Sequence, residues 1–412
     1  MSRTKGGGAS IPRLQELSFL EEAAKCVAEN RTFDEIRQAL ITHMIGMRDM
    51  SVQSGNHAIF QHARKDPHRY FSNAAEALFE LMRLDMVERS TVPSTKTAVE
   101  AYQQHRYRLT PQGEYWVAQL QNSRQAAYDV LFRSLWQTHP QFSGYLSLLA
   151  RGMFVVPTAR WTEVSTSGQR SESDRPAYMR LLAARAFRAV EAGITGWRAT
   201  EEEILGAIHS YLDERIEAAN QRQRPVPYPR NQDFVNACEE ALVSFAFRQA
   251  GIPIDYISYE ILRRWTKHLG VANFSYHVPA APALRLWATA DLVGGENGIP
   301  TVRRRGVGEW GDQVIITLPD AYELARKQEP GNSWVPIYRV RAAVCSKLGL
   351  NDPVFDAALR QFLARERTLD VSFRLNLDRP EFGKTPPSEQ PLQIVDPTGR
   401  AQTYRVMTLI PL

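Results

Sequence analysis

Two pieces of sequence in the first third of the chain decide the expected fold: LFELMRLDMVERS at Leu78–Ser90 and YRLTPQGEYWV at Tyr107–Val117. In the first piece, apolar residues recur at helical spacing and then give way to VERSTV, which is typical of a strand. In the second piece, a short strand ends at Pro111 and Gly113, and another helix follows. These pieces predict a helix, a β-hairpin joined by a polar stretch, and a long closing helix that runs to Trp136.

Two further helices are expected before this stretch. Residues 14–29 show helical apolar spacing, and Thr32 with Glu35 three residues later forms a capping box that opens a second helix. The order of helix, helix, helix and hairpin resembles the winged helix-turn-helix superfamily, in which a recognition helix runs into a wing strand and the returning strand ends in LTxxG. The resemblance implies that the helix after Ser72-Asn73 enters the DNA major groove while the wing contacts phosphates.

The same order is expected again in residues 231–328. Helices are predicted from Gln232 to Ala250 and from Ser258 to Gly270. The sequence AAPALRLWATADLVG then occupies the place of a recognition helix, and TVRRRGVGEWGDQVIITL is typical of a wing hairpin. This echo of the first copy is the strongest single indication of a repeated unit.

A third copy is expected in residues 334–412. It comprises the helix VPIYRVRAAVCSKLGL, a helix opened by Asp352-Pro353, and a hairpin around a proline-rich wing at 378–401. A first helix is hard to place, so this copy is either truncated or takes a helix from its neighbour. The expected fold class is mainly α with small β-hairpins, with two to three winged-helix domains plus a helical connector. The expected boundaries are a tail at 1–13, a first domain at 14–150, a connector at 151–230, a second domain at 231–330 and a third at 331–412.

The composition is that of an ordinary globular protein. The chain has 412 residues, of which 43% are apolar and 23% charged, and it contains no apolar run long enough to span a membrane. Cys26, Cys238 and Cys345 lie too far apart for a zinc knuckle, so we expect no disulfide and a cytoplasmic location. The formal net charge is +5, and 42 of the 50 basic residues are arginine, which suits phosphate and guanine edges but also follows from a GC-rich genome.

Basic residues in the second copy are the first candidates for DNA contact. Those on its helices and on the first wing strand are Arg263, Arg264, Lys267, His268, Arg285, Arg303, Arg304 and Arg305. The other interpretation of these residues is a solvated surface, although three consecutive arginines beside a turn are hard to satisfy internally.

The first and third copies supply further candidates. In the first copy they are Arg64, Lys65, Arg69, Lys96, Arg106 and Arg108. In the third copy they are Arg360 and Arg365, together with Arg367 and Arg374. Glu76 and Glu80 on the expected recognition helix of the first copy disfavour approach to phosphate, so that copy is alternatively a module that docks a protein.

Motifs of catalysis are not found in the sequence. The chain has no GxxxxGK[ST], HExxH or GxGxxG, and no lysine has an acid two residues before it, as restriction-type nucleases have. His57, His62 and His68 lie close together, but no cysteine or carboxylate completes a recognised metal-ligand spacing. We therefore expect no cofactor, no metal site and no enzymatic activity.

The sequence favours double-stranded DNA binding by a non-catalytic subunit of a bacterial DNA-processing or defence complex. Linked modules bind a long site because each contact raises the effective concentration of the next. Protein partners in a larger complex, or a homodimer, are expected, and a membrane partner is not. The alternatives are a transcription regulator that binds as a dimer, a scaffold whose winged modules dock proteins, and a divergent metal-dependent nuclease.

Overall fold

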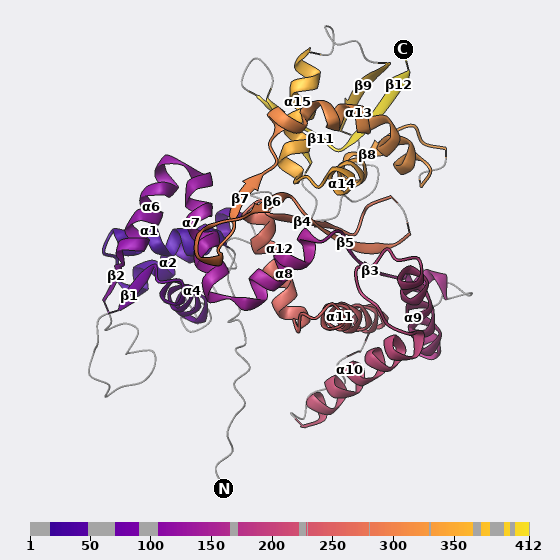
Figure 1. Ribbon diagram of the computed structural model, residues 1–412, viewed down its shortest axis with the longest axis horizontal. Helices are drawn as coiled ribbons and strands as arrows, with labels where there is room; N and C mark the ends of the chain where they lie inside the picture. The colour runs from indigo at the N-terminus through magenta and orange to yellow at the C-terminus, as the bar shows by residue number, and fades with distance from the viewer. Residues whose placement is uncertain are drawn as a thin grey trace. The chain divides into compact units, whose positions relative to one another are not determined.

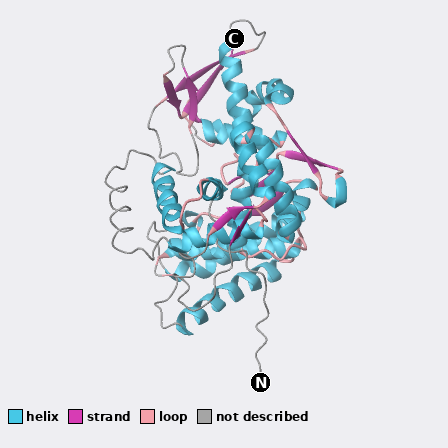
Figure 2. Ribbon diagram, turned by 90° about the vertical axis from the view of Figure 1, so that its left-hand side faces the viewer, coloured by secondary structure: helices cyan, strands magenta, loops and turns pink. Residues whose placement is uncertain are grey.

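The computed structural model describes most of the chain, namely residues 17–47, 71–89, 106–164, 172–221, 228, 230–279, 281–328, 331–365, 372–379, 391–395 and 400–411. These residues form mainly helices, with small antiparallel sheets between them (Figure 2). The expected fold class, mainly α with small β-hairpins, is therefore confirmed. The chain divides into two compact units, one of Met1–Ser143 with Glu260–Leu269 and the other of Gly144–Tyr259 with Gly270–Leu412.

The first unit begins with three helices that pack on one another and on a hairpin (Figure 1). Its elements are α1 (Leu17–Ala28), α2 (Phe33–Met47), α4 (Phe71–Arg83), β1 (Val87–Arg89), β2 (Tyr107–Leu109), α6 (Pro111–Asn122) and α7 (Arg124–Thr138). Strands β1 and β2 are antiparallel, with Val87 opposite Leu109. This is the order of elements that the sequence predicts for residues 14–125. Helices α8 (Pro140–Ala150) and α12 (Tyr256–His268) each contribute residues to both units.

Local hydrogen bonds explain where these helices start. The Thr32 N–H donates to Glu35 Oε2 at 2.7 Å, so the expected capping box is present. In the LTPQG motif, Gly113 N–H donates to the Thr110 side chain at 3.0 Å and so caps α6. A Cβ placed on Gly113 would lie 1.9 Å from the Met86 carbonyl oxygen. The motif therefore brings the start of α6 directly against the backbone that leads into β1.

Replacing Gly113 with alanine should destabilise the first unit. The new methyl group would overlap the Met86 carbonyl just before β1, so the hairpin or α6 must shift, at a cost of about 2–3 kcal/mol. Urea unfolding of the variant measures this loss. Gly206→Ala is the matched control, because a Cβ at Gly206 meets nothing within 4 Å and the substitution should leave stability equal or higher. Wild-type stability in Gly113→Ala would contradict the close approach.

The expected long helix that closes the first copy is two helices instead. Ser123 ends α6 in an extended conformation, and its side chain accepts the Ala126 N–H at 3.4 Å to cap α7. The amphipathic pattern continues across this break because both helices bury one face. The break was therefore missed, although serine is a favoured N-cap residue.

A buried polar pair lies in the core of the first unit. The Glu80 side chain on α4 is fully buried, and its Oε1 lies 3.0 Å from Nε2 of the equally buried His139. The Trp265 ring packs edge-on against His139, with 5.8 Å between ring centroids. The expectation that Glu80 faces outward and repels phosphate is wrong, because its carboxylate points into the core.

The second unit begins with a three-stranded antiparallel sheet and a helical layer. Its elements up to residue 304 are β3 (Phe154–Pro157), α9 (Arg175–Glu191), α10 (Glu201–Gln221), α11 (Asn231–Gln249), β4 (Ala272–Ser275), β5 (Ala283–Ala288), β6 (Ala290–Val293) and β7 (Thr301–Arg304). The strand order is β3-β5-β4, and β6 pairs with β7. Thr200 and Glu203 form a capping box at the start of α10. Phe154 of β3 stacks on Phe247 of α11, at 4.7 Å between centroids, so one face of the sheet packs on the helices.

One carboxyl group in this unit makes its stability depend on pH. Burial on α11 raises the pKa of Glu239 from 4.5 to about 7. Below about pH 4.5 the group is protonated in both the folded and unfolded states; between there and pH 7 only the unfolded chain gives up the proton. Stability should therefore fall across this window, by about 3 kcal/mol.

Glu239→Gln should remove this contribution. Urea unfolding at pH 5 and pH 8 measures the free energy of unfolding of both proteins. Between these pH values wild type should lose more stability than the variant, because glutamine stays neutral throughout. If the difference in unfolding free energy between the two proteins is the same at pH 5 and pH 8, Glu239 is not desolvated.

The expected recognition helix and wing of the second copy are wrong. The sequence AAPALRLWATADLVG forms strands β5 and β6, and β7 is followed by helix α13 (Val307–Arg326) where a second wing strand was expected. A short apolar run does not by itself distinguish a buried strand from a helix. The buried positions of α13 follow helical spacing and include Val314, Leu318, Ala321 and Ala325. The β-branched residues of VIITL, at the start of this stretch, suggested a strand instead.

The last part of the second unit is a three-helix layer packed on a three-stranded sheet (Figure 1). Helix α13 packs on α14 and α15 and supplies the first helix, as the alternative of a helix taken from a neighbour predicts. The elements that follow α13 are β8 (Val335–Pro336), α14 (Ile337–Leu348), α15 (Asp352–Arg365), β9 (Phe373–Asp378), β10 (Leu392–Val395), β11 (Ala401–Tyr404) and β12 (Val406–Pro411). The sheet has the order β8-β12-β9, and β10 and β11 form a second hairpin between β9 and β12.

Candidate nucleic-acid interface

Helices α14 and α15 form a helix-turn-helix whose turn is defined by its own residues. Gly349 ends α14 in the left-handed conformation at φ 65°, which favours glycine. Asn351 then accepts the Val354 N–H at 3.1 Å and caps α15. Phe355 and Leu359 on the inner face of α15 are fully buried. The opposite face of α15 is thereby turned outward.

The turn is also held from outside by the segment that was expected to be the second recognition module. Trp287 Nε1 donates to the Leu350 carbonyl at 2.9 Å, and Asn273 Nδ2 donates to Asp352 Oδ1 at 2.8 Å. Trp287 is only 3% exposed and belongs to the same core as α13, α14 and α15. The β4–β7 segment therefore acts as a platform under the helix-turn-helix.

Arg305 completes this support. Its Nη1 donates to the carbonyls of Leu348 and Gly349 at 3.0 and 3.1 Å, and its Nη2 pairs with Asp291 at 2.8 Å. The guanidinium also lies over the Trp310 ring, 5.4 Å from its centroid. The expectation that an arginine here is hard to satisfy internally is wrong, because the carbonyls at the end of α14 need donors.

The other second-copy candidates are divided between packing and surface. Arg285 lies in β5 rather than on a helix, is 9% exposed, and donates to the Ala281 carbonyl at 3.1 Å. Arg304 is half-buried and packs over Gly270. Arg303 is exposed and pairs with Glu309 at 3.1 Å. Of the expected run of three arginines, only Arg303 presents most of its side chain to solvent.

The basic residues of α12 belong to the first unit. Arg263 and the more exposed Arg264 both pair with Glu260 on the same helix. His268 is exposed, and it lies 3.0 Å from the Tyr128 hydroxyl and 3.5 Å from the Glu21 carboxylate. Lys267 is partly exposed.

The first wing is only partly described. Arg108 is 78% exposed and pairs with Glu88 across the hairpin at 2.6 Å, and Arg106 is exposed. The remaining expected residues of this region lie outside the described part of the chain: Arg64, Lys65, Arg69, Lys96, His57, His62 and His68.

The outward face of α15 carries the side chains best placed to reach a large ligand. Arg360, Gln361 and Ala364 are exposed there. Arg360 Nη1 donates to the Gln393 carbonyl of β10 at 3.0 Å, which ties the helix to the second hairpin. Arg365 is the last residue of α15, and its side chain lies outside the described part. On the inner side, Arg341 of α14 pairs with Asp356 of α15 at 2.9 Å and holds the two helices together.

The two hairpins beside α15 are basic. Across residues 372–379, 391–395 and 400–411 the exposed charged residues are four arginines and a single acid: Arg374, Arg379, Arg400, Arg405 and Asp378. Arg379 donates to Gln402 Oε1 at 3.0 Å, which joins β9 to the second hairpin. Sequence reasoning missed Arg379, Arg400, Arg405 and Gln361. A charge count gave no signal for the arginines, because residues 374–405 carry five basic and four acidic side chains.

Comparisons with known proteins leave the site to be judged on its own chemistry. No family model matches the chain, and neither a curated protein nor a solved structure is significantly similar to it.

In the described ranges, histidine, cysteine and acidic side chains gather nowhere in a group that could hold a metal ion. None of the helices described has the length and apolar character needed to cross a membrane. The three cysteines are free and buried.

Proposed function

We propose that the chain binds double-stranded DNA and that α15 with the hairpins β9–β12 and β10–β11 is the contact surface. The observation that carries this proposal is the set of four exposed arginines, with a single exposed acid among the described hairpin residues, beside an outward-facing helix on a supported turn. The order α13, β8, α14, α15, β9, β12 is also the order of helices and wing strands expected from the winged helix-turn-helix resemblance. The contact surface thus moves from the second expected copy to the third.

The two parts of this surface suit different tasks. Arginine and glutamine side chains form paired hydrogen bonds with guanine and adenine in the major groove, so Arg360 and Gln361 are the base-reading residues. The small side chains of Ala357 and Ala364 on the same helix let its backbone come close to the bases. The hairpin arginines suit the phosphates on either side, because their charge attracts any sequence equally.

The proposal assigns the remaining structure to support and assembly. The β4–β7 platform positions α15, and the first unit supplies a second module of similar element order. Within the proposal the chain positions partner proteins on DNA as a non-catalytic subunit.

The test is a fluorescence titration of the full chain with duplex DNA at several salt concentrations. We expect the logarithm of the association constant to fall linearly with the logarithm of the salt concentration. The slope should be about −3 to −4 if each hairpin arginine neutralises one phosphate. Arg360→Ala should weaken binding to a preferred sequence by about 10- to 100-fold and weaken random sequence far less. Arg188→Ala is the control, because Arg188 is exposed on α9.

Two results would overturn the proposal. One is the absence of salt-dependent binding by wild type at low salt. The other is an equal loss of affinity in Arg360→Ala and Arg188→Ala, which would place the contact surface away from α15.

A further inference from the structure

Strand β2 of the first unit has an edge that no described strand occupies. It pairs with β1 on one side, and Thr110 N–H donates to the Met86 carbonyl at 3.1 Å at the start of that ladder. Because hydrogen-bonding directions alternate along an antiparallel strand, the N–H and C=O of Leu109 point to the other side. An open edge of this kind is a template for another extended segment.

The second unit shows the same place filled. There the returning strand β12 pairs on one side with β9 and on the other with β8, where Met407 lies opposite Val335. Strand β8 comes from the chain between α13 and α14. In the first unit the corresponding chain between α1 and α2, residues 29–32, forms a turn and no strand. Among the described residues of the first unit, no strand therefore takes the place that β8 takes in the second.

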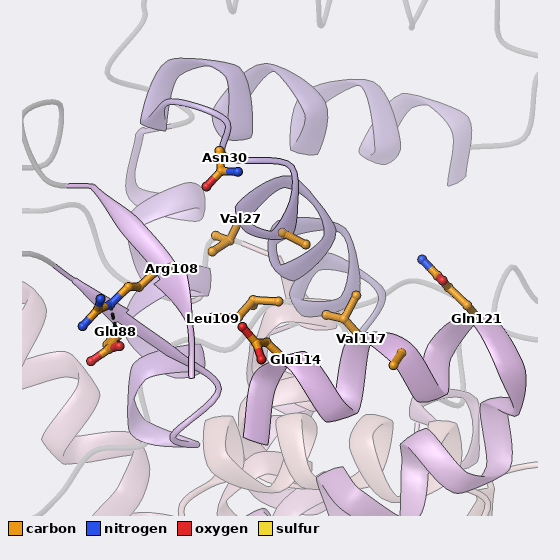
Figure 3. Close-up of a pocket in the computed structure, with 10 residues that line it drawn as sticks. Val27, Asn30, Glu88, Arg108, Leu109, Glu114, Val117 and Gln121 are labelled. Carbon is orange, nitrogen blue, oxygen red and sulfur yellow. Dashed lines mark ion pairs between the residues drawn. The ribbon is translucent and has the colours of Figure 1, made fainter. Parts of the chain in front are cut away.

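A groove of about 670 Å³ lies at this position (Figure 3). It is lined by Leu109 on β2, which is half-buried, and by Val27 and Val117, which are buried beneath it. At its rim, Arg108 is paired with Glu88, whereas Glu114 has no ion pair with another residue that lines the groove. A strand edge that no described strand occupies and a carboxylate at the rim together describe the occupant.

We propose that an extended peptide segment of a partner protein binds in this groove as a third strand on β2. Main-chain hydrogen bonds to Leu109 provide affinity, as in other cases of strand addition. Alternate apolar side chains of the peptide pack on Leu109 and Ala118, and a lysine or arginine pairs with the exposed Glu114. This site is separate from the DNA surface on α15, so the inference does not rest on DNA binding.

The experiment uses the full chain and a short synthetic peptide in which valine alternates with threonine and lysine. The readouts are fluorescence anisotropy and hydrogen exchange of the Leu109 amide. We expect saturable binding that slows exchange at Leu109. A peptide methylated on alternate backbone nitrogens should bind at least about tenfold more weakly, because each lost main-chain hydrogen bond costs about 1 kcal/mol.

Matched variants on α6 locate the binding site. Ala118→Arg places a long side chain in the groove and so displaces part of the peptide. It should weaken binding at least about tenfold, which corresponds to about 1.4 kcal/mol. Asn122→Arg makes the same charge change at an exposed position that does not line the groove, and it should leave binding unchanged. The proposal is overturned if the two peptides bind equally, if the two variants behave alike, or if wild type binds neither peptide. Protection of Leu109 by duplex DNA instead of peptide would also overturn it.

Discussion

Changing Arg374, Arg379, Arg400 and Arg405 together to glutamine should lower the affinity for duplex DNA about 1,000-fold at low salt. Each of these side chains is exposed, and each phosphate contact that is lost costs about 1 kcal/mol. The slope of log affinity against log salt should become shallower by about 3 to 4, because four fewer counterions are released. The loss should be equal for preferred and random sequences, since phosphates carry no sequence information.

A second quadruple variant controls for the change in net charge. Arg180, Arg188, Arg198 and Arg248 are exposed in the same unit, on or beside α9 and α11, and are distant in sequence from the hairpins. Their change to glutamine should reduce affinity only slightly, through the general field of the protein. If both quadruple variants lose the same affinity and the same salt slope, the hairpins are not the contact surface.

Replacing Trp287 with alanine should destabilise the second unit by about 4 kcal/mol. The indole is almost fully buried in the core formed by α13, α14 and α15, so its removal leaves a large cavity. The change also leaves the Leu350 carbonyl without its 2.9 Å hydrogen bond. Urea unfolding or differential scanning calorimetry measures the loss.

Trp287→Phe separates the two contributions. It keeps most of the ring and removes the N–H donor, so we expect a loss of about 1 kcal/mol. Trp334→Ala is the comparison for a less buried tryptophan of the same unit and should cost less than Trp287→Ala. Near-wild-type stability of Trp287→Ala would show that the platform does not support the helix-turn-helix.

The first unit was largely predictable because its signals are local. The Thr32–Glu35 capping box and the cap at Thr110 are hydrogen bonds between residues three apart, and the side chains that make them are recognisable in sequence. The hairpin of the first unit follows directly from its apolar pattern. The burial of Glu80 was not predictable, because its partner His139 lies much later in the chain, between α7 and α8.

The site was predicted less well than the fold, for the same reason. The sequence gives no reason to distinguish the consecutive arginines Arg303, Arg304 and Arg305, yet only Arg303 is largely exposed. Arg305 is satisfied by carbonyls 43 and 44 residues later, which no local pattern indicates. Conversely, Arg400 and Arg405 lie in the expected third wing but were not among the expected DNA contacts, and the hairpins place them beside α15.

The order of helices and hairpin in the first unit was determined by sequence alone, because caps, turns and helical spacing act over a few residues. Only the tertiary structure decided that ALRLWA is a strand. It also decided that this strand holds the turn before α15, through a bond from Trp287 to Leu350, 63 residues away. Whether a short apolar run becomes strand or helix, and whether an arginine faces water, depends on partners that the fold brings together. Those partners moved the proposed DNA surface from the second expected copy to the third.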